Sequence, residues 1–190
     1  TTLAPLLLMI SLLIKIDSKG PVIFKQIRLG KNGRLFTIYK FRTMCDNAVN
    51  QGTGIFTSEH DPRITRVGRY LRKTSLDELP QLVNVLKGEM SFVGPRPPLE
   101  NHPNKYSEYS EFQKLRFKII PGITGYAQAF GRSSLTWHER IEMDVYYYKN
   151  FSLLLDIKII IATLFTVVLS KGTYPSDNRT KNTNKISREI

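Results

Sequence analysis

The sequence predicts a mostly helical α+β fold, and three patterns in its 190 residues indicate this. Two strongly apolar segments lie near the ends, at 3–14 and 151–169. Two short runs rich in β-branched and aromatic residues, 22–29 and 35–41, flank a glycine-containing turn. Between residues 63 and 149, apolar side chains recur with a helical period. We therefore expect helices that pack around one β-hairpin.

The first apolar segment runs from Leu3 to Ile14 and ends at Lys15. As a helix it would extend about 18 Å, whereas a hydrocarbon core is about 30 Å thick. It could be the second half of a straight spanning helix. Because Pro5 would kink a helix, it could also enter the membrane and turn back. The residues alone leave both alternatives open, and since the chain opens with Thr1 inside the run we expect an incomplete N-terminus.

The β-hairpin is predicted by the dipeptide Asn32-Gly33 between the two β-prone runs, a strong signal for a tight turn. Gly20-Pro21 separates the hairpin from the first apolar segment. Residues 45–61 lack periodicity and are expected to form a loop.

Three amphipathic helices are expected after this loop. The first begins near Arg63 and carries a basic face, which could simply be a solvated surface. The second is indicated by leucines and valines spaced between 79 and 86 and ends at Gly88. Proline- and glycine-rich connections at 94–98 and 121–125 enclose a further helical stretch. The third amphipathic helix covers 137–149.

The second apolar segment contains a narrow polar stripe when it is drawn as a helix. The stripe consists of Ser152, Asp156, Thr163, Thr166 and Ser170. Such a stripe predicts an interfacial helix that packs partly on the protein and partly on lipid, although the segment is long enough for a spanning helix. The polar tail is expected to be disordered. The predicted division is therefore a membrane-inserted helix at 1–19, a compact cytosolic domain with interfacial helices at 20–170, and a tail at 171–190.

The composition restricts the partners and the compartment. A net charge of +12 indicates an anionic partner, such as nucleic acid, an acidic lipid surface or a phosphorylated small molecule. The single cysteine, Cys45, excludes an internal disulfide and fits a reducing compartment. Its neighbours offer no obvious base, so we do not expect it to be a nucleophile.

The most informative segment is 75–80, which contains the adjacent acids Asp77 and Glu78. As a structural feature, either Ser75 or Asp77 could cap a helix, and Asp77 would leave Pro80 within the first turn. Capping does not explain the basic helix that comes immediately before. A carboxylate faced by arginines should have a depressed pKa and stay ionised, which suits Mg²⁺ binding or attack on phosphorus. Arginine holds phosphate oxygens well. Together these features indicate phosphoryl transfer involving a membrane-borne substrate.

Four stretches of the chain resemble the bacterial sugar transferases, the monotopic polyprenyl-phosphate phosphoglycosyl transferases. They are GPVIFKQIRLGKNGRLFTIYKFRTM (20–44), DPRITRVGRYLRKTSLDELPQLVNVLKGEMSFVGPRP (61–97), PGITGYAQAFGR (121–132) and DVYYYKNFSLLLDIK (144–158). They occur in the family's order and, together, cover most of residues 3–169. Motifs of this length are very specific.

The resemblance implies a reaction in which a UDP-sugar and undecaprenyl phosphate, with Mg²⁺, give polyprenyl diphosphate-sugar and UMP. It implies that Asp77 is the nucleophile and forms an aspartyl phosphosugar, while Glu78 supports Asp77 and the metal. Arg72 would hold phosphate, and Arg96, within the motif Pro95-Arg96-Pro97, would contact the nucleotide. Weaker candidates for phosphate or nucleotide contact are Lys40, Arg42, Gln128 and Arg132.

The resemblance also implies a place at the cytoplasmic face of a bacterial membrane, with the N-terminal helix broken at Pro5 and re-entering the leaflet it came from. Ala4 stands where the family has a serine, so hydroxyl back-bonding cannot help to fix the break. Tyr126 replaces a frequent tryptophan, and Ala129-Phe130 replaces a common Val-Asn pair, which bears on sugar choice. A homodimer is compatible with the sequence, but no residue indicates it.

Two rival hypotheses explain less of the sequence. A basic nucleic-acid-binding module would account for the net charge but for neither apolar segment, so we expect no nucleic-acid partner. A non-catalytic scaffold that keeps the fold would not need the intact set of Asp77, Glu78, Arg72 and Arg96.

Overall fold

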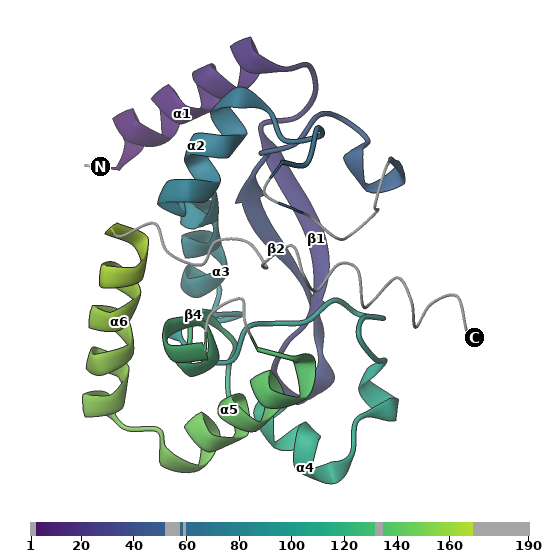
Figure 1. The fold of residues 1–190 in the computed structure, drawn as a ribbon, viewed down its shortest axis with the longest axis vertical. Coiled ribbons are helices and arrows are strands. Elements are labelled where there is room, and N and C mark those ends of the chain that lie inside the picture. The colour runs from purple at the N-terminus through teal and green to yellow at the C-terminus, as the bar shows by residue number, and fades with distance from the viewer. Residues whose placement is uncertain (1–2, 52–57, 59, 132–134, 169–190) are drawn as a thin grey trace.

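The structure is a computed structural model that describes residues 3–51, 58, 60–131 and 135–168. It mixes helices with short strands, as the sequence predicts (Figure 1). The β1–β2 hairpin runs along one side of the molecule and α6 along the opposite side, with α2 and α3 between them. Helices α1 and α5 lie toward opposite ends. Among the described residues, no helix has both the length and the apolar character needed to cross a membrane.

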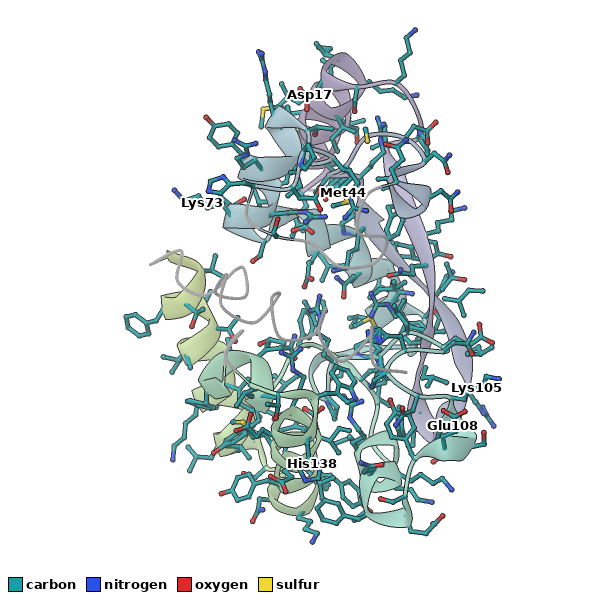
Figure 2. The ribbon with its side chains drawn as sticks, turned by 45° about the vertical axis from the view of Figure 1, so that its right-hand side comes forward. Asp17, Met44, Lys73, Lys105, Glu108 and His138 are labelled. Carbon is teal, nitrogen blue, oxygen red and sulfur yellow. The ribbon has the colours of Figure 1, made fainter. Side chains whose placement is uncertain are left out.

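Helix α1 (Ala4–Asp17) packs on α2 (Arg66–Thr74) through a cluster that includes Ile10, Ile14 and Leu71. At its end, Asp17 Oδ2 accepts a hydrogen bond from the backbone N–H of Val67 at 2.9 Å. Asp17 therefore neutralises part of the positive end of the α2 dipole. Figure 2 shows Asp17 at the end of the molecule opposite His138 of α5, and exposed Lys73 of α2 at its side.

Pro5 lies in the first turn of α1, where a missing backbone N–H breaks no hydrogen bond. The described part of α1 is therefore one helix without a break. Since the description begins at Leu3, the re-entrant bend at Pro5 stays a prediction.

The predicted hairpin is confirmed. Strand β1 (Ile23–Leu29) pairs antiparallel with β2 (Leu35–Phe41), so that Leu29 lies opposite Leu35. The 3₁₀ turn η1 (Lys31–Gly33) joins them, and Asn32 and Gly33 have φ of 55° and 75°. This left-handed conformation matches the right-handed twist of the strands, which is why asparagine and glycine are favoured there. The following loop contains the 3₁₀ turn η2 (Ala48–Asn50).

Helix α2 begins after Thr65, whose Oγ1 caps the helix by accepting the N–H of Gly68 at 3.0 Å. The same helix lies very close to the chain that follows β2. A Cβ on Gly68 would lie 2.1 Å from the carbonyl oxygen of Thr43, so only glycine fits. The helix ends at Ser75, which adopts φ of 55°. This contact fixes the end of α2, and hence the acidic pair, against the hairpin.

The second predicted amphipathic helix is divided in the structure. Residues Leu76–Gln81 form a 3₁₀ helix, η3, and only Leu82–Leu86 form an α-helix, α3. The side chain of Ser75 makes no capping hydrogen bond there, and Asp77 lies inside η3, so neither predicted cap is present. Pro80 explains the difference, because it lacks the N–H that a continuous α-helix would need at that position.

The region between the connections at 94–98 and 121–125 is less helical than predicted. It contains the short helix α4 (Glu111–Lys114) between two 3₁₀ turns, η4 (Tyr106–Glu108) and η5 (Leu115–Phe117). On either side, β3 (Ser91–Val93) and β4 (Gly122–Thr124) form a parallel pair that was not predicted. A π-helical turn, η6 (Ala127–Gly131), follows β4.

The last two helices confirm the prediction. Helix α5 (Trp137–Asn150) starts with a capping box of Thr136 and Glu139, and α6 (Leu153–Val168) packs Ile159, which is 0% exposed, into the core. Two members of the polar stripe contact the protein: Asp156 accepts a hydrogen bond from Tyr147, and Thr163 bonds Thr124. The other side of α6 is exposed and, apart from Lys158, apolar. The domain boundaries at 19 and 170 stay predictions, and the tail lies outside the described residues.

Candidate active site

The acidic pair lies in the first turn of η3, which packs against β2. The backbone N–H of Glu78 donates to the carbonyl of Ser75 at 3.2 Å and holds the turn. Neighbouring side chains on a 3₁₀ helix point about 120° apart. Asp77 and Glu78 therefore lie in different surroundings although they are adjacent in sequence.

Glu78 is neutralised by two cations from separate elements. Its Oε1 atom accepts hydrogen bonds from Nζ of Lys40, at 2.6 Å, and from Nη2 of Arg96, at 3.1 Å. Burial alone would raise the pKa of Glu78, but the charges of Lys40 and Arg96 outweigh it and hold the pKa at about 2. Glu78 in turn raises the pKa of Arg96, whereas burial lowers that of Lys40. Glu78 thus fixes two cations beside Asp77.

Asp77 has a different environment. Burial raises its pKa to about 6, because the opposing charges of Lys40, Arg72 and Arg96 compensate only in part and Glu78 adds repulsion. No hydrogen bond to its carboxylate comes from the described residues. The prediction of a depressed pKa is therefore right for Glu78 and wrong for Asp77. The physical reason is that the hydrogen-bonding cations are aimed at Glu78, so Asp77 is desolvated without being directly paired.

Arg72 reaches the site from the last turn of α2. Its Nε donates to Oγ1 of Thr43 at 2.8 Å, which orients the guanidinium. Its charge lowers the pKa of Asp77, so the two groups lie within electrostatic range of each other. The two Nη atoms of Arg72 donate no hydrogen bond to a described residue, so they are suited to donate to phosphate oxygens.

The segment 95–97 is held by its backbone carbonyls. The carbonyl of Pro95 accepts the N–H of Gly122, that of Arg96 accepts Nη2 of Arg116, and that of Pro97 accepts Nη1 of Arg28, at 3.0–3.1 Å. These three contacts leave the side chain of Arg96 directed to Glu78. Pro95 and Pro97 thus contribute backbone rigidity.

Sequence reasoning missed Arg28, Arg116 and Asp144. Arg116 and Asp144 form an ion pair at 2.5 Å in which each side chain is 1% exposed. A signal for this pair was present, because Asp144 lies on the same face of α5 as Ile141 and Val145, and an acid on a buried face needs a partner. The partner itself could not be identified, since Arg116 comes from a different element.

The weaker candidates have separate positions. Arg42 donates to the carbonyls of Ser18 and Lys19, just after α1. Gln128 of η6 donates Nε2 to the carbonyl of Ile123 at 3.0 Å. Arg132 lies outside the described residues. Contact of these three with phosphate or nucleotide stays a prediction. Among the described members of this group, only Lys40 forms a hydrogen bond with the acidic pair.

The acidic pair fits a magnesium ion whose coordination is completed by substrate. No group of three or more His, Cys, Asp or Glu side chains that could hold a metal occurs in the described parts of the chain. Magnesium, however, is commonly held by one or two carboxylates together with substrate phosphates and water. The carboxylate of Asp77 and Oε2 of Glu78, neither of which accepts a hydrogen bond from a described residue, could supply that pair of ligands.

Known proteins have sequences similar to that of this chain. Residues 1–170 match the family model described as bacterial sugar transferase. The chain is 43% identical over 167 residues to the sugar transferase EpsL of Bacillus subtilis, covering 88% of this chain and 80% of EpsL.

Two longer relatives have names that specify a reaction. A UDP-N-acetylgalactosamine-undecaprenyl-phosphate N-acetylgalactosaminephosphotransferase of Aeromonas hydrophila is 44% identical over 172 residues. A UDP-glucose:undecaprenyl-phosphate glucose-1-phosphate transferase of Escherichia coli is 43% identical over 181 residues. These alignments cover 89% and 90% of this chain but only 40% and 38% of the relatives.

Proposed function

Because the chain belongs to the bacterial sugar transferase family, we propose that it transfers a phosphosugar from a UDP-sugar to undecaprenyl phosphate. The products are polyprenyl diphosphate-sugar and UMP, and the reaction primes glycan assembly. The observation that carries this proposal is the pair of unlike carboxylates, with Asp77 desolvated and unpaired beside a neutralised Glu78. Two relatives are named for this reaction with different sugars, which supports the reaction class and leaves the sugar open.

The chemistry proceeds in two displacements at one phosphorus atom. A carboxylate oxygen of Asp77 attacks the phosphorus that bears the sugar, and the bond from that phosphorus to the oxygen of UMP breaks with its electron pair. An oxygen of the lipid phosphate then attacks the same phosphorus and displaces Asp77. Dividing the transfer in this way lets two dissimilar substrates use one site in turn.

The surrounding residues support the first displacement. A pKa of about 6 leaves Asp77 mostly ionised at neutral pH, while making it more basic than an ordinary aspartate. Lys40, Arg72 and Arg96 provide positive charge where negative charge gathers on phosphate oxygens. A magnesium ion held by Asp77 and Glu78 would supply further charge neutralisation.

The apolar surfaces of α1 and α6 support a position at the membrane. Their outward faces expose many large apolar side chains, with Lys15 and Lys158 as the exposed charges among them: Leu8, Met9, Leu12, Leu13 and Ile16 on α1, and Leu153, Leu154, Ile157, Ile160, Ile161, Leu164 and Phe165 on α6. Faces of this kind are typical of helices that lie in the interfacial region of a bilayer. We place them in the cytoplasmic leaflet, with α1 re-entering at Pro5, so that the site can reach a lipid-linked phosphate.

UMP release from a panel of UDP-sugars, with undecaprenyl phosphate and Mg²⁺, tests the proposal. We expect release with one or a few sugars, dependent on the lipid phosphate, and its loss in Asp77→Asn and in EDTA. The matched variant Asp46→Asn changes an exposed aspartate and should keep full activity. Appreciable turnover by Asp77→Asn would remove Asp77 from the reaction, and full activity in EDTA would remove the metal.

A further inference from the structure

Helix α2 carries a row of exposed side chains that the proposed reaction does not use. The row consists of Arg66, Arg69, Tyr70 and Lys73. Their spacing of three and four residues places them on one face of the helix, and buried Gly68 and Leu71 lie on the other. We call the exposed row the α2 stripe.

The positive charges of the α2 stripe are not balanced within the described residues. Arg66, Arg69 and Lys73 form no ion pair with a described carboxylate, and α2 itself contains no acidic residue. A helix face that is merely solvated usually mixes charges of both signs. A row of one sign instead indicates an anionic partner.

The neighbouring helices α1 and α6 have the same charge bias. Both contact α2, and they expose Lys15 and Lys158 within their apolar faces. Their carboxylates, Asp17 and Asp156, are half-buried and accept hydrogen bonds from other elements of the protein. In its described part, the surface of these three helices therefore combines cations with apolar side chains and exposes no carboxylate.

The α2 stripe faces the side of the molecule on which α6 lies. The opposite side of α2 is covered by the chain after β2, where a Cβ on Gly68 would lie 2.1 Å from the carbonyl oxygen of Thr43. The hairpin and α6 run along opposite sides of the molecule, with α2 between them (Figure 1). Figure 2 shows Lys73 projecting from α2 on the α6 side, away from the hairpin. The cations of α2 thus lie beside the apolar faces.

A bilayer surface with negatively charged headgroups matches this combination. When apolar helix faces enter the acyl region, arginine and lysine extend to the headgroups, and tyrosine is favoured at the same depth. We propose that Arg66, Arg69 and Lys73 bind the phosphate groups of anionic lipids, so that the chain prefers a negatively charged bilayer to a neutral one. This inference rests on the membrane position in the proposed function and adds a preference for lipid charge to it.

The contact has a consequence for the active site. Arg72 lies in the last turn of α2, and the acidic pair follows directly after the helix. Binding of the α2 stripe to headgroups therefore holds Arg72 and Asp77 close to the depth at which the phosphate of a lipid-linked substrate lies.

Cosedimentation of the full chain with vesicles tests this inference without relying on turnover. The probes are vesicles of phosphatidylcholine alone and vesicles in which roughly a third of the lipid is phosphatidylglycerol. The wild-type chain should bind the charged vesicles about tenfold more tightly, and added salt should reduce this advantage. Arg66→Gln/Arg69→Gln should lose most of the advantage and bind neutral vesicles as the wild type does. Arg66→Lys/Arg69→Lys should keep the advantage, because the charge remains.

The matched control, Lys31→Gln/Arg34→Gln, removes the same charge from exposed positions at the turn of the hairpin. It should change either affinity by less than about twofold, because charges beyond a Debye length from the lipid contribute little. Equal affinity of the wild-type chain for both kinds of vesicle would overturn the inference, as would equal losses in the control and in the glutamine variant.

Two further outcomes have separate meanings. Tighter binding of duplex DNA than of charged vesicles, lost in Arg66→Gln/Arg69→Gln, would assign the α2 stripe to nucleic acid and overturn the inference. Failure of the proposed membrane position would look different, since the wild-type chain would then bind neither kind of vesicle. Failure of the proposed reaction would abolish UMP release and leave the preference for charged vesicles intact.

Discussion

The two acids of the active site show how position decides the chemistry of a residue. Asp77 and Glu78 are adjacent carboxylates, yet the pKa of one is raised to about 6 and that of the other is held at about 2. Both are half-buried, so burial alone cannot separate them. The difference comes from Lys40 and Arg96, which place their hydrogen bonds on Glu78 only. Asp77 keeps a free, basic carboxylate as a result.

A second acid at this scale, Asp61, supports the fold. It is 4% exposed and forms an ion pair with Arg63 at 2.6 Å, and Arg63 also donates to the carbonyls of Ala48 and Gln51. The hydrogen bond from Arg63 lowers the pKa of Asp61. An acid with a lowered pKa stabilises the fold at pH values above its ordinary pKa of about 4, and this stabilisation is lost as pH falls through the lowered value.

Asp61→Asn should therefore lower the free energy of unfolding by about 3 kcal/mol at pH 7, because it removes a buried ion pair and weakens the hydrogen bonds that Arg63 donates to the carboxylate. The difference from the wild-type chain should shrink as pH falls below about 4. Urea unfolding at pH 7 and pH 3 measures both, with exposed Asp46→Asn as the control. A loss of equal size at both pH values would show that the charge of Asp61 is not the cause.

At the scale of elements, Asn84 joins the hairpin to the segment that carries the acids. Asn84 is 0% exposed, and its side chain accepts the N–H of Tyr39 and donates to the carbonyl of Thr37 and to Glu89. It thereby occupies the edge of β2 that β1 leaves free, as a neighbouring strand would. Because Lys40 follows Tyr39, this contact sets the register between Lys40 and Glu78.

Asn84→Ala should destabilise the chain by about 2–4 kcal/mol, because buried backbone groups of β2 lose their partners. UMP release should fall even below the unfolding temperature, since the Lys40–Glu78 pair is no longer held in register. Thermal unfolding and turnover measured together check this, with exposed Asn101→Ala as the control. Wild-type turnover in a destabilised variant would limit Asn84 to a structural role.

The sequence predicts elements well where the signal is local. The Asn32-Gly33 turn specifies the hairpin, and the Thr136 cap marks the start of α5. The β3–β4 pair could not be predicted, because strands of three residues are defined by their partner rather than by their own pattern. The acidic pair could be found because it directly follows the basic helix in the sequence. Arg28 and Arg116 come from distant elements, and their contacts with segment 95–97 are visible only in the structure.

At the scale of the whole molecule, apolar surface is concentrated on α1 and α6. Within the polar stripe of α6, Thr163 bonds Thr124, and the opposite side exposes leucines, isoleucines and Phe165. Burying such side chains in lipid is favourable by about 1.5–3 kcal/mol each. In the proposed function these two faces contact the bilayer, so that the acidic pair can reach a lipid-linked phosphate.

Leu164→Glu should weaken binding to neutral phospholipid vesicles by about tenfold or more, because it removes an apolar group and adds a charge to the proposed lipid face. Cosedimentation with vesicles measures the change. Leu35→Glu, the same substitution at an exposed position on the hairpin, is the control and should have little effect. Equal effects of both variants would mean that α6 does not contact lipid.

The central claim, that Asp77 carries the phosphosugar, is tested most directly by intact-protein mass spectrometry after incubation with a UDP-sugar and Mg²⁺ in the absence of lipid phosphate. The account predicts a mass increase of one phosphosugar on the wild-type chain and about one equivalent of UMP released per protein. It predicts neither for Asp77→Asn, and loss of the adduct when undecaprenyl phosphate is added. The same adduct on Asp77→Asn, or UMP release only when both substrates are present and without any adduct, would contradict it.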